Sequence, residues 1–286
     1  MDKRFLYGYV KFEAKIKTLT GLRIGGRRET IEIGGIDLQA IKDPVTGFPY
    51  IPGSSLKGKL RSLVEKINNK VILQPDGKRE AGEPYGIDGK KPEELATGKE
   101  YFIIRIFGNH KGDVGLEPRL IVRDFICLEK DRDKIYEIKV ENIVNRITGT
   151  AEHPREVERV RKGIEFKGEI IYKLLGWGIL EEKDVLNQAK EELKKLEQAI
   201  EYLMKYDYLG GSGTRGYGKV ALWFEKIEVE LDGKKTELIL QADKNRGTFK
   251  INVKGEQNEL VNYLKEFMEK IYLTALQEAK EYGEQI

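Results

Sequence analysis

Several stretches of the chain alternate apolar and polar residues with a period of two, which is the pattern of half-buried β-strands. These stretches are residues 10–17, 164–174 and 220–224, with shorter apolar runs at 120–127 and 136–140. After Phe224 the apolar phase slips by one residue, so we expect a β-bulge near Glu225.

Three other stretches carry apolar residues at helical spacing. The first stripe consists of Leu56, Leu60, Leu63, Val64 and Ile67. It predicts a helix over residues 54–69, and longer stripes predict helices over 184–206 and 257–281. We expect Ser54 or Ser55 to cap the first helix, because the preceding Pro-Gly pair opposes an earlier start.

The order of these elements is strand, helix, strands, helix, strand. This is the split β-α-β plan of an α+β, ferredoxin-like (RRM-like) core, which we expect to span residues 1–231. Two insertions should interrupt the core, a polar lid at 70–118 and a charged, irregular segment at 144–163. The turn signal Asp232-Gly233 predicts a hairpin followed by the last helix, so residues 232–286 should form an extension packed on the core.

Composition narrows the possible functions. The 286 residues carry 51 Lys+Arg and 48 Asp+Glu, so any strongly basic surface must be local. With Cys127 as its only cysteine and His110 and His153 as its only histidines, the chain has no disulfide or cysteine-based zinc site, and two-histidine nuclease chemistry is disfavoured. There is no apolar run of the ~18 residues that a membrane span needs and no signal peptide, so we expect a cytoplasmic protein without a membrane partner.

Three glycine motifs match nucleotide-binding signatures in spacing but not in context. Gly53–Lys59 has the spacing of a P-loop, but Leu60 follows where a serine or threonine should hold magnesium. Gly211–Gly216 has the dinucleotide-fold spacing, but it follows a helix and precedes a strand, which is the reverse of that fold. Residues 215–222 are similar to the RNA-recognition signature of ferredoxin-like sheets, but Lys219 and Leu222 replace two base-stacking aromatics.

The head of the first predicted helix has the features of a phosphate site. Lys57, Lys59 and Arg61 lie close to the free amide groups of the first turn. Gly58 would cost about 1 kcal/mol relative to alanine in a helix interior, which suggests that a nucleic-acid backbone passes nearby. The alternative is an ordinary solvated helix face, with Arg61 paired to a neighbouring acid.

A second candidate for phosphate contact lies near the end of the core. It consists of Gly211, Ser212, Gly213, Thr214 and Arg215. Arg23 lies in a similar glycine-rich run after the first strand. Glycine lets backbone amides approach a phosphate closely, so we expect both segments to contact a polynucleotide backbone.

Eight short motifs follow one another along the chain. They are Thr20–Gly26, Ile36-Asp37, Ile41–Pro44, Ile51–Lys59, Phe107–Asn109, Arg123-Asp124, Arg146–Thr148 and Leu209–Gly218. In this order they resemble the RAMP superfamily of CRISPR proteins, over about residues 8–228. Within the superfamily the chain is most similar to the backbone subunits of type III-A (Csm) interference complexes.

The resemblance implies a set of partners. Copies of the chain would stack as a filament along a guide RNA, together with other Csm subunits, and the guide would pair with a target RNA. The serine-lysine helix and the second glycine-rich segment would grip the guide. Residues 148–159 would form the family's thumb, which wedges into the guide–target duplex, with Thr148, Ala151 and Pro154 as its contact residues.

The resemblance also implies catalysis. Asp37 matches the family's catalytic aspartate, which cuts target RNA with the help of a divalent metal ion such as magnesium or manganese. Taken alone, an aspartate after glycines is an ordinary turn residue. Some relatives carry zinc in the lid, but a chain with a single cysteine is not expected to do so.

Two other functions stay open on the sequence. The chain could be a non-catalytic backbone scaffold of the same superfamily, with cutting done elsewhere. It could also be a stand-alone enzyme that processes precursor guide RNA, but the lack of a histidine near the first strand or the basic helix argues against this.

Overall fold

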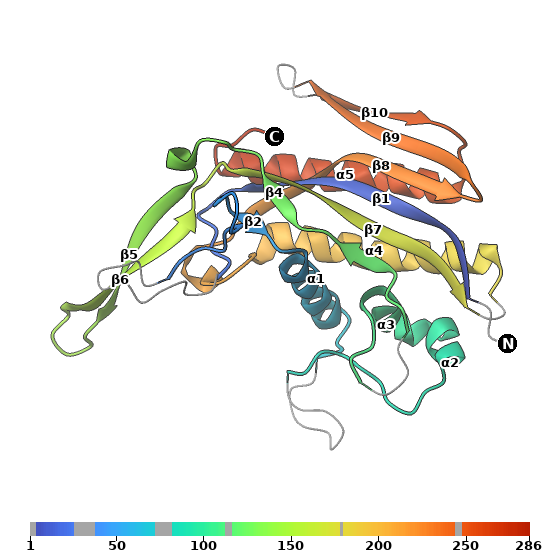
Figure 1. The fold of residues 1–286 in the computed structure, drawn as a ribbon, viewed down its shortest axis with the longest axis horizontal. Coiled ribbons are helices and arrows are strands. Elements are labelled where there is room, and N and C mark those ends of the chain that lie inside the picture. The colour runs from blue at the N-terminus through green and yellow to red at the C-terminus, as the bar shows by residue number, and fades with distance from the viewer. Residues whose placement is uncertain (1–3, 26–37, 72–81, 112–115, 178–179, 244–247) are drawn as a thin grey trace.

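The computed structural model describes residues 4–25, 38–71, 82–111, 116–177, 180–243 and 248–286 (Figure 1). Its strands are β1 (Arg4–Thr18), β2 (Tyr50–Ile51), β3 (Leu120–Val122), β4 (Phe125–Cys127), β5 (Tyr136–Val144), β6 (Ala151–Val160), β7 (Glu165–Trp177), β8 (Val220–Leu231), β9 (Lys234–Asp243) and β10 (Thr248–Lys254). Its helices are α1 (Gly53–Ile67), α2 (Pro92–Thr97), α3 (Phe102–Phe107), α4 (Glu182–Tyr206) and α5 (Glu259–Glu281), with short 3-10 turns at Lys99–Tyr101, Arg132–Lys134 and Gly213–Arg215.

One antiparallel sheet organises the molecule, in the order β10-β9-β8-β1-β7-β4-β2, with β3 also paired to β7. Its central part, β8-β1-β7 followed by β3 and β4, has the strand order of a ferredoxin-like fold, since α1 follows β1 and α4 follows β7. The predicted fold class is therefore confirmed. The predicted bulge is also present, because Glu13 pairs with Lys226 and Ala14 with Phe224, which leaves Glu225 as the extra residue.

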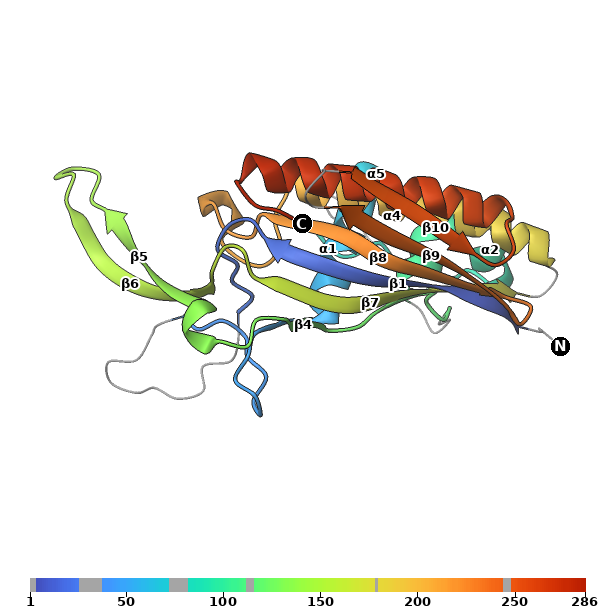
Figure 2. The same ribbon diagram turned by 90° about the horizontal axis from the view of Figure 1, so that it is seen from above.

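The two faces of the sheet differ because apolar and charged residues alternate along its strands. Val10, Ala14 and Ile16 are fully buried on the face that α4 and α5 cover (Figure 2). The opposite face carries ion pairs between neighbouring strands, such as Lys15 with Glu225 at 2.7 Å. None of the helices in these residue ranges is long and apolar enough to cross a membrane.

The segment after β8 continues the same sheet and the same helical layer. The turn between β8 and β9 lies at Asp232 and Gly233, both with positive φ, as the sequence predicted. Rings of Phe12, Phe224 and Phe267 lie 5.0–5.9 Å apart and join β1, β8 and α5. Strand β10 is an element that the sequence analysis did not anticipate.

Three other local expectations were wrong. Residues 144–163 are not irregular, because half of them form β6, and β5 and β6 build a two-stranded hairpin that projects from the body (Figure 2). The apolar run 120–127 is divided into β3 and β4 by Arg123 and Asp124. Helix α1 begins at Gly53 with Pro52 as its N-cap, and no side chain of the N-cap residue caps it.

Candidate nucleic-acid interface

The start of α1 is capped from a distant part of the chain. The backbone N–H of Gly53 donates to Oδ1 of Asp124 at 2.7 Å, whereas Ser54 is exposed and Ser55 is half-buried. A Cβ on Gly53 would lie only 2.1 Å from the carbonyl oxygen of Val122, so the close approach that brings Asp124 to the helix needs a glycine. A carboxylate at this position opposes the binding of a second anion there, because helix N-termini attract negative charge only where it is not already supplied.

The three predicted RNA-binding cations of α1 all contact protein oxygens. Nζ of Lys57 donates to the carbonyl of Leu120 at 2.9 Å, and burial, together with the charges of Arg61 and Lys173, lowers the pKa of Lys57. Nζ of Lys59 lies 3.1 Å from Oδ1 of Asp207 and 4.3 Å from the ring centre of Tyr208.

Arg61 forms the ion pair that the sequence left open as an alternative. Its Nε lies 2.8 Å from Oε1 of Glu65, one helical turn later, and its Nη2 donates to the carbonyl of Tyr85. RNA contact by Lys57, Lys59 or Arg61 therefore stays a prediction, and it would require RNA to displace these internal partners.

The glycine-rich loop, residues 209–218, is a compact turn held against the first glycine-rich run. Ser212 adopts a left-handed conformation, and a 3-10 turn covers Gly213–Arg215. A Cβ on Gly213 would lie 1.9 Å from the ring of Tyr208, so no larger residue fits. The N–H of Gly211 donates to the carbonyl of Arg23 at 2.8 Å, which brings the two predicted phosphate-binding segments together.

Arg23 lies over this loop. A Cβ on Gly211 would be 3.8 Å from its Nη1, and one on Gly25 would be 3.7 Å from its Nη2. Its Nε is buried and has no hydrogen-bond partner within the described part of the chain. Of the predicted RNA-binding cations, all of which lie in the described ranges, Arg23 alone has neither a hydrogen bond nor an ion pair from its side chain.

The glycine-rich loop is also joined to the hairpin formed by β5 and β6. Nη1 of Arg215 lies 2.9 Å from Oε2 of Glu141. The buried ring of Tyr217 lies 4.5 Å from Nζ of Lys139 and 4.7 Å from Cζ of Arg159. Burial and the neighbouring Glu141 carboxylate raise the pKa of Tyr217 to about 12.

The sequence analysis missed these hairpin residues as parts of the interface. A signal was present, because charged residues alternate with Ile138 and Val140 along β5, which places Glu137, Lys139 and Glu141 on one face. The pattern does not indicate that this face contacts the glycine-rich loop.

The predicted thumb residues lie at the outer end of this hairpin. Thr148 is in the connecting turn, Ala151 begins β6, and Pro154 follows His153, whose φ of 51° marks an irregularity in the pairing. All are exposed. Ile147 at the tip is 95% exposed, so the end of the hairpin presents apolar surface to its surroundings.

Asp37 lies outside the described residues. The next residue, Leu38, is fixed at the base of the hairpin, because its carbonyl accepts from the N–H of Glu158 at 3.0 Å. The carboxylate of Glu158 is buried and pairs with Nζ of Lys42 at 2.6 Å. Across the ranges that the structure describes, no three or more His, Cys, Asp or Glu residues come together in a way that could hold a metal ion.

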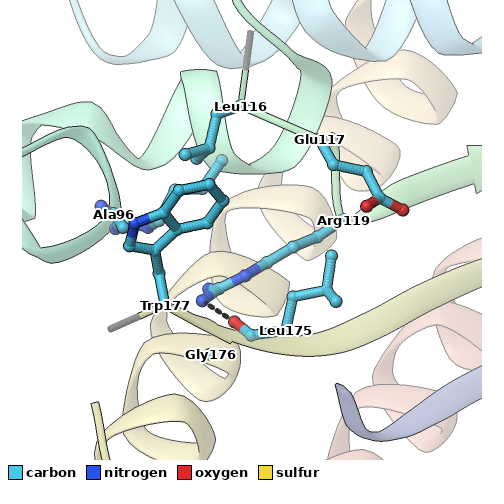
Figure 3. Close-up of a pocket in the computed structure, with 8 residues that line it drawn as sticks. Ala96, Leu116, Glu117, Arg119, Leu175, Gly176 and Trp177 are labelled. Atoms are coloured by element: carbon cyan, nitrogen blue, oxygen red, sulfur yellow. Dashed lines mark hydrogen bonds between the residues drawn. The ribbon is translucent and has the colours of Figure 1, made fainter. Parts of the chain in front are cut away.

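A small cavity lies between α2, α3, β7 and the segment 116–119 before β3, and none of its lining residues is a predicted RNA-binding residue (Figure 3). Its volume is about 20 Å³, which is room for one water molecule. Buried Arg105 and Arg119 both pair with Glu192, at 2.6 and 3.0 Å, and Nη2 of Arg119 donates to the carbonyl of Leu175. This network ties the lid to the core.

Comparison with known proteins agrees with the motif order and the fold. The model of the RAMP superfamily matches residues 15–221. The chain belongs to the RAMP superfamily. Two curated relatives carry the name CRISPR system Cms endoribonuclease Csm3. The one from Streptococcus thermophilus is 38% identical over 78% of this chain and 90% of the relative. The one from Methanocaldococcus jannaschii is 40% identical over 77% of this chain and 81% of the relative.

A solved structure supports this RAMP fold. The crystal structure of Methanopyrus kandleri Csm3 aligns with a TM-score of 0.54, covering 80% of this chain and 79% of that one at 23% identity. At this level of identity the likeness concerns the fold alone. The curated relatives place the chain in the Csm3 branch of the RAMP superfamily, as the sequence motifs indicated.

Proposed function

We propose that this RAMP protein is the guide-RNA-binding backbone subunit of a type III-A CRISPR interference complex, and that it cuts target RNA at regular intervals. Its partners are a guide RNA, a target RNA, further copies of itself and other Csm subunits. Support comes from curated relatives that are named endoribonuclease Csm3 and are up to 40% identical to it.

The position of Arg23 over the glycine-rich loop supports the proposal that the chain binds a guide RNA. Among the residues that the structure describes, no hydrogen bond or ion pair engages the guanidinium of Arg23, and it lies beside the glycine backbone of the loop. This arrangement suits a phosphate, which forms charge-assisted hydrogen bonds with arginine. The nearby aromatic residue of the loop, Tyr217, is buried, so bases have no stacking surface on it. Contacts of this kind hold any guide sequence.

The cleavage half of the proposal assigns the chemistry to Asp37. Its carboxylate would accept the proton of a ribose 2′-hydroxyl on the target strand. The 2′-oxygen then bonds to the adjacent phosphorus, and the bond from phosphorus to the 5′-oxygen breaks. The leaving 5′-oxygen takes a proton from water, and a 2′,3′-cyclic phosphate remains. Thr148, Ala151 and Pro154 at the end of the hairpin would displace a target nucleotide and so bring the three reacting atoms into line.

A divalent cation is a separate part of the proposal. The described residues offer no cluster of three or more side chains that could hold one. Asp37, which lies outside the described residues, would be one protein ligand of the ion, and RNA oxygens would complete its coordination. Removal of the ion with EDTA should stop cutting but leave the guide bound.

The deciding experiment replaces Asp37 by alanine in the assembled complex. We expect Asp37→Ala to abolish cutting of a labelled target RNA while target binding stays within about twofold, because the carboxylate acts on the reaction and not on the base pairs. Asp43→Ala, which changes a half-buried turn aspartate six residues further along the chain, is the matched control and should cut normally. If Asp37→Ala gave the wild-type product pattern, the chain would be a scaffold and the cutting residue would lie elsewhere.

A further inference from the structure

The ion pair between the glycine-rich loop and the hairpin uses one of the predicted RNA-binding cations. The side chain of Arg215 is 54% exposed, whereas that of Glu141 is only 14% exposed. The arginine therefore reaches solvent, and the carboxylate is the sheltered partner. An exposed arginine at a glycine-rich turn is available to a phosphate only if that partner releases it.

The surroundings of Glu141 show that this release would not detach the loop. Nζ of Lys139 lies 3.8 Å from its other carboxylate oxygen, so Glu141 keeps a cation nearby without Arg215. The contacts of Tyr217 with Lys139 and Arg159 hold the base of the loop on the hairpin independently. The backbone bond from Gly218 to Gly21 adds a further anchor.

We propose that Glu141 is an internal competitor of RNA, whose carboxylate occupies Arg215 until a backbone phosphate replaces it. The inference rests on the proposed function, because a guide phosphate is the competing anion. Carboxylate and phosphate both bind the guanidinium fork, so the two are mutually exclusive partners. Arg215 is the exposed partner of this ion pair, so a phosphate can reach its guanidinium, while Lys139 stays beside the sheltered carboxylate of Glu141.

The exchange has a mechanical consequence. When Arg215 turns to the phosphate, β5 loses its ion pair with the glycine-rich loop and keeps only the contacts at its base. RNA held by the loop thereby loosens the hairpin at Glu141, between the base of the hairpin and the tip that carries Thr148. Guide binding and the freedom of the thumb are coupled through one carboxylate.

The test measures binding of a fluorescein-labelled single-stranded oligouridine RNA by the full chain at low salt. Glu141→Gln removes the competing charge and keeps the size of the side chain, so RNA should bind about two- to fivefold more tightly than to wild type. Glu256→Gln is the control. The carboxylate of Glu256 pairs with Nζ of Lys234 at 2.9 Å, outside the hairpin and the glycine-rich loop, so the substitution removes the same charge without freeing Arg215 and affinity should not change.

The Arg215→Gln background separates competition from a general charge effect. In that background Glu141→Gln should give no gain, because the contested guanidinium is gone. An equal gain with and without Arg215 would overturn the inference, and so would unchanged affinity of Glu141→Gln in the wild-type background. A different result would contradict the proposed function itself. In that result wild type binds no RNA, although wild type and Glu141→Gln have the same melting temperature and both are therefore folded.

Discussion

Glycines at three positions of this chain meet different surroundings. A Cβ would collide with Val122 at Gly53 and with Tyr208 at Gly213, so these two positions need glycine for packing. At Gly58, in the middle of α1, nothing lies within 4 Å of a Cβ. The folded chain gives no reason for glycine there, which leaves the approach of a partner as the physical explanation offered by the sequence.

Gly58→Ala therefore has two separable effects. We expect it to raise the free energy of unfolding of the isolated chain by about 0.5–1 kcal/mol, because alanine loses less backbone entropy in a helix. If RNA passes close to α1, the same methyl group should weaken guide binding severalfold. Urea unfolding and RNA titration measure the two effects, with Gly53→Ala as the control that should destabilise the chain. Greater stability with unchanged RNA affinity would show that no backbone approaches Gly58.

At the scale of elements, the long-range cap of α1 changes the picture of the basic helix. The sequence suggested serines at the helix start and free amides for a phosphate. In the structure Asp124, on the short connection between β3 and β4, accepts from the first helical N–H. The same residue, Asp124, therefore separates β3 from β4 and caps α1. The break in the predicted strand at 120–127 and the capping of the helix have one cause.

Asp124→Ala should lower the free energy of unfolding by about 1 kcal/mol, the usual cost of losing a side-chain cap. Ser54→Ala should change it little, because Pro52 and not a serine is the N-cap residue. Denaturant titrations of the two variants distinguish the long-range cap from the serine cap that the sequence suggested. Equal losses would mean that Ser54 contributes to the cap after all.

At the scale of the whole molecule, a buried ionic network joins the lid to the core. Glu192 of α4 accepts from Arg105 of α3, from Arg119 before β3 and from Tyr172 of β7. Each member is buried and hydrogen-bonded, so the network acts as one unit. The lid is thus tied to α4 and β7 and is not simply appended to α1.

Glu192→Ala would leave two buried guanidinium groups without their carboxylate. We expect a loss of about 3–5 kcal/mol, which is a large part of the stability of an ordinary domain. Exposed Glu191 on the same helix is the control, and Glu191→Ala should change stability by less than about 0.5 kcal/mol. Proteolysis within residues 82–111 checks whether the lid opens first. A loss near zero would contradict the role of the network.

The sequence predicted part of the candidate site. It indicated Arg23, Lys59 and Arg215 as RNA-binding residues from their glycine and helix contexts, and the structure brings the loops that carry Arg23 and Arg215 together. It could not identify Asp207 or Glu141 as their neighbours. A charged surface residue has no periodic signature that names its partner.

The sequence by itself determined the long strands and long helices of the core, the bulge at Glu225 and the turn at Asp232-Gly233, but not β2, α2, α3 or the division of residues 120–127 into β3 and β4. The features that it determined follow from burial on one side of each element and from backbone conformation, which are local properties repeated at a fixed period. The tertiary structure alone decided that Asp124 caps α1 from 71 residues away, that Glu192 gathers two arginines, and that Glu141 occupies Arg215. Such contacts depend on how elements distant along the chain pack together, and the identity of a single charged residue does not specify its distant partner.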